Sequence, residues 1–150
     1  MKAKEYLQEI KKMDEVIRNT LEEIKVLEAL ATSATASMEG ERVQSSSDQQ
    51  RMANTVNKMV DMKKQLVADI ARYAQLREEA IHIVNQACDG DCISLLRKRY
   101  LGEYNEKTQK VEFYSWEQIA VNMGYSYNWV SKGLHQRALS QVQKYLKMQN

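Results

Sequence analysis

Residues 115–146 read SWEQIAVNMGYSYNWVSKGLHQRALSQVQKYL, and their spacing predicts two helices joined by a tight turn. Ser115 and Gln118 are spaced as a capping box, so a helix is expected to begin between them. Gly124 follows the last apolar residue of that helix, where the backbone needs a left-handed conformation. Ser126 is placed to cap a second helix. Together these signals predict a helix-turn-helix, the unit that lays a short helix in the major groove of DNA.

Each of the two expected helices has one apolar face. On the first helix this face comprises Trp116, Ile119, Ala120 and Met123, and on the second it comprises Val130, Leu134, Ala138 and Val142. The other face of the second helix carries side chains that can reach a base edge or a phosphate. These are the candidate DNA contacts: Tyr127, Asn128, Ser131, Lys132, His135 and Arg137. The alternative is an ordinary helical hairpin packed in a core.

The candidate contacts differ in the part of DNA that they suit. Asn128 suits adenine, and Lys132 suits guanine or a phosphate. His135 and Arg137 suit the DNA backbone, where contacts position a protein without reading sequence.

Composition limits the class of protein. The chain has 150 residues, no proline and five glycines, which favours long uninterrupted helices because proline breaks a helix interior. No apolar run is long enough to span a bilayer, and the first residues lack the apolar segment of a signal peptide, so we expect a cytoplasmic location. No glycine-rich phosphate loop, nucleophile elbow or paired metal motif occurs in the sequence. We therefore expect neither an enzyme nor a cofactor.

Charge is distributed unevenly along the chain. The net charge is only +2, but residues 1–92 hold 13 basic and 16 acidic side chains, whereas residues 93–150 hold 9 basic and 4 acidic ones. The basic excess coincides with the expected helix-turn-helix, as a DNA-binding surface requires. Because the excess is modest, we expect two copies to bind one site.

Two heptad patterns precede the basic region. In residues 3–31, apolar side chains recur every seven residues at Ala3, Ile10, Ile17, Ile24 and Ala31, with a second set three residues later. In residues 49–87 the repeat runs through Met52, Met59, Leu66, Tyr73 and Ala80. The Ser-rich residues 32–48 between them are expected to form a loop. The patterns do not decide whether the helices pair within one chain or between two chains.

The resulting expectation is an all-α protein with two regions. Residues 1–88 would form a long antiparallel coiled-coil hairpin that serves for oligomerisation, and residues 93–150 would form the helix-turn-helix domain.

A CDGDC sequence joins the two regions. Asp89 and Gly90 are turn formers, so the two cysteines, Cys88 and Cys92, are expected to be thiols flanking a turn. A disulfide is not expected in the cytoplasm, and zinc would need two more ligands, so no metal site is expected.

Two further elements are expected between the cysteines and Ser115. Ile93, Leu96 and Tyr100 share one helical face, which predicts a short helix that stops at Gly102. Residues 110–114 alternate weakly between polar and apolar, as in a small β-hairpin or an ordered loop.

Three segments, LLRKRYLG, SWEQIAVNMGYS and RAL, give residues 93–147 a resemblance to region four of bacterial sigma factors. The resemblance implies a short helix ending in an Arg-Tyr pair, followed by a helix-turn-helix. It also implies binding to the −35 promoter element and to the flap of RNA polymerase. Two departures stand out. Residues 103–114 make a longer link than is usual, and Gly133 occupies a position that is apolar in the sigma pattern.

The whole chain also resembles a family of small proteins from phages and prophages of Gram-positive bacteria, related in style to the ArpU and RinA late-gene regulators. The shared features are the KEYL-type start, the MEGERVQSS segment (residues 38–46), a second long helix and the sigma-like end. This resemblance implies phage-encoded transcription regulation. Together with the heptads and the charge, it leads us to expect a homodimer that acts in the bacterial cytoplasm on double-stranded DNA.

Two other functions suit the same sequence. A sigma-like end could bind RNA polymerase or its sigma factor without reading DNA. Alternatively, a helix-turn-helix joined to an oligomerising helical region could belong to the small terminase subunit that packages phage DNA.

Overall fold

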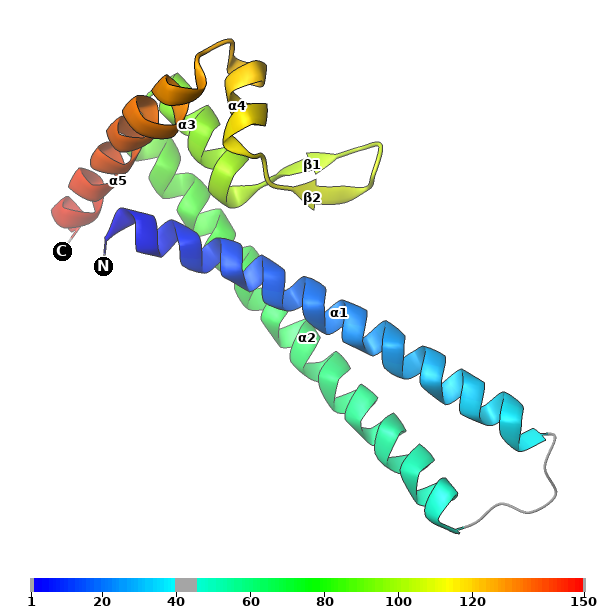
Figure 1. Ribbon diagram of the computed structural model, residues 1–150. Coiled ribbons are helices and arrows are strands. Elements are labelled where there is room, and N and C mark those ends of the chain that lie inside the picture. The colour runs from blue at the N-terminus through cyan, green and yellow to red at the C-terminus, as the bar shows by residue number, and fades with distance from the viewer. Residues whose placement is uncertain (1, 40–45, 150) are drawn as a thin grey trace. The chain divides into compact units, whose positions relative to one another are not determined.

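The computed structural model describes residues 2–39 and 46–149, and most of them are helical (Figure 1). The elements in chain order are the long helices α1 (Ala3–Glu39) and α2 (Ser46–Ala87), the short helix α3 (Gly90–Leu96), the π-helical turn η1 (Arg97–Leu101), the strands β1 (Glu103–Asn105) and β2 (Lys110–Glu112), the helix α4 (Trp116–Met123), the π-helical turn η2 (Trp129–Leu134) and the helix α5 (His135–Gln149). The predominantly helical class predicted from the sequence is confirmed, with a two-stranded sheet as its exception.

The chain divides into two compact units whose edges differ from the expected boundary at residues 88–93. Unit 1 comprises Met1–Lys12 and Tyr73–Asn150, and unit 2 comprises Met13–Arg72. Both long helices therefore contribute to both units. The reason is that Leu7 from α1 and Val84 from α2 are fully buried in the same core as α3, α4 and α5. The C-terminal elements share one core with these helix ends.

Unit 2 consists of a segment of α1 and a segment of α2. The predicted heptad positions Ile17, Ile24 and Leu27 of α1 and Leu66 of α2 are buried, as the pattern requires. An ion pair of 3.0 Å joins Lys63 Nζ of α2 to Glu28 Oε1 of α1. Three other apolar side chains of this α1 segment are exposed, with exposed fractions of 55 % for Val16, 40 % for Leu21 and 58 % for Leu30.

The loop expected at residues 32–48 is largely wrong. Helix α1 continues to Glu39 and helix α2 begins at Ser46, while residues 40–45 lie outside the described part of the chain. The segment 32–39 contains neither glycine nor proline, and serines and threonines tolerate a helix when their hydroxyls bond the preceding turn. Thr32 does so, because its hydroxyl donates to the Glu28 carbonyl at 2.8 Å. A small and polar composition was therefore a poor guide to the helix end.

Unit 1 has a continuous apolar core, to which α3, η1, α4, η2 and α5 all contribute. Its largest fully buried side chains are Leu7, Leu95, Leu96, Leu101, Ile119, Leu134, Val84, Val130, Val142 and Cys92. Polar contacts tie the long helices to this core. The backbone N–H of Ala3 donates to Gln143 Oε1 at 2.8 Å, and the Arg77 guanidinium donates to the carbonyls of Leu101 and Gly102 at 3.0 Å each.

The segment between α2 and the hairpin follows the sequence expectations. Asp89 caps α3, and its carboxylate accepts from the Cys92 N–H at 3.4 Å. The short helix ends at Gly102, whose φ of 75° is in the left-handed region. Strands β1 and β2 then pair antiparallel, with Tyr104 opposite Val111, so the hairpin is the correct choice between the two expectations for this region. Among the described helices, none combines the length and apolar character needed to cross a bilayer.

Gly102 is the glycine that the fold tolerates least in substitution. A Cβ built there would lie 2.5 Å from Val111 Cγ1, on a backbone with positive φ. We expect Gly102→Ala to lower the free energy of unfolding by about 2–4 kcal/mol, because it adds a clash to the strain of an alanine at φ 75° and ψ 158°. Chemical denaturation measures the change.

Two other glycines supply matched controls. Gly124→Ala has the same φ, a ψ of 28° that alanine tolerates better, and no neighbour within 4 Å, so it should cost about 1–2 kcal/mol. Gly90→Ala involves neither a positive φ nor a close neighbour, so it should leave the free energy of unfolding unchanged. Equal losses for Gly102→Ala and Gly124→Ala would show that the contact with Val111 has no energetic weight.

Candidate nucleic-acid interface

Helix α4 and the turn that follows it carry the start and stop signals seen in the sequence. The Ser115 hydroxyl accepts from the Gln118 N–H at 3.2 Å, and the Gln118 side chain accepts from the Ser115 N–H at 2.9 Å. At the other end Gly124 is left-handed, with φ 75° and ψ 28°. The N–H groups of Gly124 and Tyr125 both donate to the Ala120 carbonyl at 3.0 Å. The turn is therefore fixed by its own backbone bonds.

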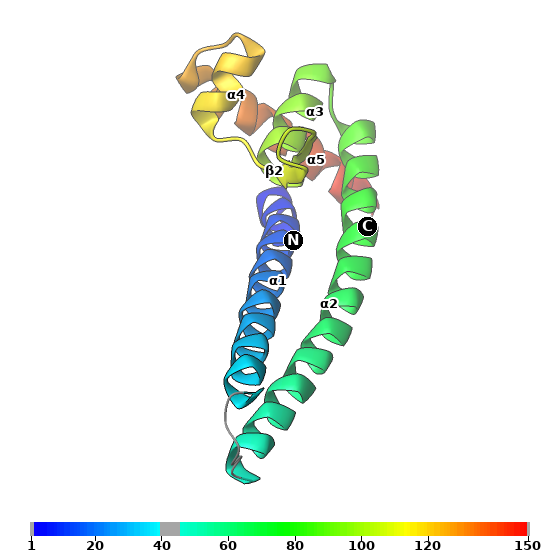
Figure 2. The same ribbon diagram turned by 90° about the vertical axis from the view of Figure 1, so that its right-hand side faces the viewer.

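A second helix begins directly after this turn. The Ser126 hydroxyl accepts from the Trp129 N–H at 3.2 Å, and the Ser126 carbonyl accepts from the Val130 N–H at 3.1 Å. Residues 127–149 are then continuously helical, through η2 and α5. The Tyr125 hydroxyl donates to the Asp91 carboxylate at 2.6 Å and so fastens the turn to α3. In both Figure 1 and Figure 2 this turn lies at the periphery of unit 1.

The first turns of the second helix separate clearly into an inner and an outer face. Val130 and Leu134 are buried, with exposed fractions of 0 % and 2 %. Tyr127 is 46 % exposed, and Asn128 and Lys132 are also exposed. We refer to these three residues and Ser131 as the outer face. Ser131 is half-buried, and its hydroxyl donates to the Tyr127 carbonyl at 2.8 Å.

Trp129 lies beside this outer face, and its ring explains why a glycine occupies position 133. A Cβ on Gly133 would lie 2.3 Å from Trp129 Cε3 and 2.4 Å from Cζ3, so the indole ring occupies the space that a side chain would need. Trp129 stays 44 % exposed although it covers the glycine. The glycine lies within the π-helical turn η2 (Trp129–Leu134).

His135 is a correction to the predicted contacts. Its side chain is only 8 % exposed, its Nε2 lies 2.7 Å from the Tyr100 hydroxyl, and its ring lies 4.7 Å from that of Trp116. Burial, reinforced by the positive charges of Lys4 and Arg99, lowers the pKa of His135 to about 4. A neutral imidazole held in the core cannot serve as a DNA contact. His135 lies three residues before Ala138 and seven before Val142, which are both buried, so the spacing along its own helix places it beside the apolar stripe.

Arg137 is exposed but engaged with its own chain. Its Nη2 lies 2.7 Å from the Asp89 carboxylate, which also accepts from the Gln141 side chain at 3.4 Å. Hydrogen bonds from Cys92 and Gln141 and the charge of Arg137 lower the pKa of Asp89. The pair joins the cap of α3 to α5, so Arg137 has a structural role that spacing alone did not indicate.

Two cations of the Arg-Tyr helix lie against aromatic rings. The Arg99 guanidinium lies 4.4 Å from the ring centre of Trp116, and Lys98 Nζ lies 5.2 Å from that of Tyr114. Lys98 also pairs with Glu103 at 3.0 Å. Both side chains are half-buried and anchor η1 to the start of α4. The positive charge of Lys98 and Arg99 would by itself suggest DNA contacts. Their aromatic and acidic partners indicate a structural role instead.

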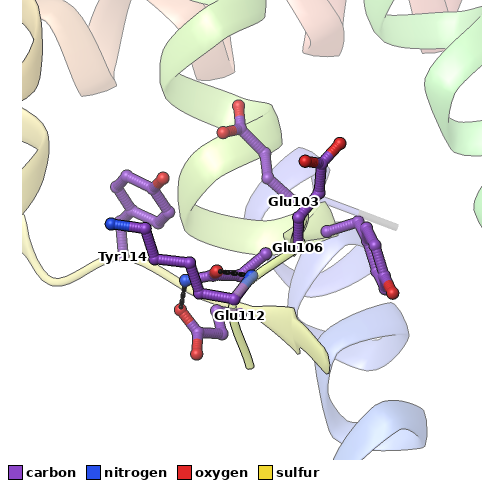
Figure 3. Close-up of a pocket in the computed structure, with 7 residues that line it drawn as sticks. Glu103, Glu106, Glu112 and Tyr114 are labelled. Carbon is purple, nitrogen blue, oxygen red and sulfur yellow. Dashed lines mark hydrogen bonds between the residues drawn. The ribbon is translucent and has the colours of Figure 1, made fainter. Parts of the chain in front are cut away.

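The hairpin presents an acidic surface. A shallow pocket of about 380 Å³ is lined by Glu103, Tyr104, Asn105, Glu106, Lys107, Glu112 and Tyr114, and Figure 3 shows its three glutamates around the opening. Glu112 accepts hydrogen bonds from Asn105 and Thr108 at 3.0 and 2.9 Å. Of the three glutamates, Glu103 is paired with Lys98 at 3.0 Å, and Lys107 lines the same pocket.

The two cysteines are free thiols next to the cap of α3. Burial raises the pKa of Cys88 to about 11 and that of Cys92 to about 12, so both are protonated and weakly nucleophilic at neutral pH. Within residues 2–39 and 46–149, no three His, Cys, Asp or Glu side chains gather closely enough to hold a metal ion.

No protein-family model, curated protein or solved structure matches this chain. The residues and their geometry are thus the grounds on which a function can be inferred.

The contact between Trp129 and Gly133 can be tested with a double-mutant cycle. In a Trp129→Ala background, Gly133→Ala should raise the free energy of unfolding by about 1 kcal/mol, since alanine is the better helix former. With Trp129 present, the indole must move and this gain should disappear. Chemical denaturation of the four chains gives the coupling, expected at about 1 kcal/mol or more. Additive effects would mean that the ring does not rest on the glycine.

The buried His135 should make stability depend on pH. Its pKa is about 4 in the folded chain and about 6.5 when unfolded, so the unfolded state takes up the proton first. Stability should be unaffected by this group above pH 6.5 and fall as the pH drops from 6.5 towards 4, by on the order of 3 kcal/mol.

His135→Gln keeps an acceptor for Tyr100 without a titrating ring, and it should flatten this part of the stability curve. Denaturant unfolding at a series of pH values measures it. The exposed His82, changed to Gln, controls for the loss of one histidine. An unchanged slope in His135→Gln would contradict the assignment.

Proposed function

We propose that this chain is a sequence-specific DNA-binding transcription regulator that reads the major groove as a helix-turn-helix. The observation that carries the proposal is the division of the second helix into two faces. Val130 and Leu134 are buried, while Tyr127, Asn128 and Lys132 point into solvent on the same turns. A helix with a fixed inner face and a polar outer face at its first turns is what groove reading requires.

The outer face offers complementary chemistry for base edges. The Asn128 amide can bond adenine through a donor and an acceptor, and Lys132 can bond guanine or a phosphate. No side-chain bond of Lys132 is recorded within the described residues, and its ammonium is exposed. Tyr127 and Trp129 add exposed apolar area beside them, which suits the methyl group of thymine.

Electrostatics favour two copies on one site. Residues 93–150 carry a net charge of +5, which is small for a chain that must neutralise several phosphates. Two copies would double the charge. A homodimer assembled through the long helices would then bind half-sites about one turn of DNA apart, or a multiple of it.

The biological setting follows the resemblance to sigma region four and to phage late-gene regulators. On that ground we infer a phage-encoded regulator of the ArpU and RinA style, which acts in the cytoplasm of its bacterial host on a promoter-like site. Support from the chain itself comes from the capped helices, Gly124 and the short helix with Arg99 and Tyr100.

A second candidate function is binding to RNA polymerase or its sigma factor without reading DNA. Val121 of α4 favours it, because this side chain is 85 % exposed on the helix that precedes the turn. In that case the chain would capture polymerase and fail to bind DNA even at low salt.

The proposed reading face can be tested by selecting bound DNA from a random pool and then comparing variants in gel shifts. Asn128→Ala/Lys132→Ala should abolish preference for the selected site, with an affinity loss of tenfold or more, since each good base contact contributes about 1–3 kcal/mol. Lys132→Ala alone should reduce the salt dependence of binding if the lysine contacts a phosphate.

Lys147→Ala, which removes an exposed cation at the far end of α5, is the matched control and should retain the preference. Circular dichroism should show unchanged helix content in all variants. A double variant that still selects the same DNA would sink the proposal.

A further inference from the structure

A pocket in unit 1 lies where the first turns of α1 and the last turns of α5 meet α2. All three helices contribute side chains to its lining. The backbone N–H of Ala3 donates to Gln143 Oε1 at 2.8 Å, which holds the ends of α1 and α5 together (Figure 1). The volume of the pocket is about 420 Å³, within the range of about 300–1,000 Å³ that is usual for small-molecule sites.

The walls of this pocket are largely apolar and are held by the core. Tyr6 of α1, Ile83 of α2 and Leu146 of α5 line it, are half-buried and pack against the core of unit 1. Tyr145 of α5 also lines it and is half-buried. Because the core anchors these walls, the pocket needs no ligand to form it. Two of the four side chains are aromatic, and the face of an aromatic ring attracts a cation.

The charge of the pocket is negative. Glu79 of α2 lines it and makes no ion pair within residues 2–39 and 46–149. No lysine or arginine is among the lining residues. The hydroxyl of Tyr6 is buried and bonds no other described residue, and burial together with the charge of Glu79 raises the pKa of Tyr6 to about 12. The pocket therefore offers a carboxylate without a positive partner.

We propose that this pocket binds a small organic ammonium ion, namely a primary or secondary amine with an apolar substituent. The ammonium group would donate to the Glu79 carboxylate, since charge-assisted hydrogen bonds are the strong ones. The apolar part would cover Ile83 and Leu146. An anion would be repelled by Glu79, and a neutral ligand would gain little from it. The inference goes beyond the proposed function and does not depend on DNA binding.

The first test titrates the full chain with benzylamine and follows the backbone amide signals by two-dimensional NMR. We expect saturable shifts that centre on the lining residues, with a dissociation constant on the order of 1 mM, as suits so small a probe. Benzyl alcohol has nearly the same shape without the charge and should bind about tenfold more weakly or worse. Benzoate, which reverses the charge, should not bind.

The second test changes the carboxylate. Glu79→Gln keeps the shape of the side chain and should weaken benzylamine binding about tenfold or more. Glu78→Gln, at the neighbouring exposed position outside the lining, is the matched control and should leave the affinity unchanged. Both glutamates are exposed, so neither change disturbs the core, and the amide spectrum itself shows whether each variant is folded.

A third variant tests the aromatic wall. Tyr145→Leu keeps an apolar side chain without the ring and should weaken benzylamine binding about twofold to fivefold. Tyr104→Leu, on the hairpin and away from the pocket, should have no effect.

Four results would overturn the proposal. The absence of saturable shifts up to about 10 mM benzylamine would show that the pocket does not take an amine. Shifts centred elsewhere would place the amine at another site. Equal affinities for benzylamine and benzyl alcohol would assign the pocket to a neutral ligand. An unchanged affinity in Glu79→Gln would remove the carboxylate from recognition.

Discussion

Burial of one face of the helix over residues 127–149 is the constraint on which unit 1 depends. Val130, Leu134, Ala138 and Val142 are all 2 % exposed or less, and they contribute to the same core as Ile119 of α4 and Leu95 of α3. Because this stripe fixes the rotation of the helix about its axis, it also fixes which side chains face solvent. The outward position of Asn128 and Lys132 is thus a consequence of core packing. A site built in this way needs no ligand to form it.

The core reaches beyond the C-terminal elements because these are too small to enclose it. The first turns of α1 and the second half of α2 complete it, through Leu7, Ile10, Ala80 and Val84. Polar bonds then set the alignment of the elements, with Arg77 holding the end of η1 and Asp89 joining α3 to α5. Buried His135 adds a neutral hydrogen bond to Tyr100 in the middle of this assembly. Small domains gain stability by recruiting such neighbouring segments.

Sequence reasoning succeeded where local chemistry determines structure. The capping box at Ser115, the left-handed Gly124 and the stop at Gly102 are each dictated by one or two residues, and the structure has all of them. It failed where contacts between residues far apart in the sequence determine the structure. The contacts of His135 with Tyr100 and Trp116 join distant parts of the chain, and the spacing within its own helix does not reveal these partners. Similarly, the unit boundary within α2 depends on which residues share a core. The heptad repeat is the same on both sides of this boundary and therefore does not reveal it.

The two tryptophans sit in different surroundings, and this gives the chain two intrinsic optical probes. Trp129 is half exposed beside the outer face, so its fluorescence emission should respond to a molecule bound at that face. Trp116 lies 4.7 Å from the His135 ring and 4.4 Å from the Arg99 guanidinium, so its emission should respond to protonation inside the core, since a charged imidazole quenches indole. Replacing either one by phenylalanine would isolate the signal of the other. Surface events and interior events could then be followed separately in unlabelled protein.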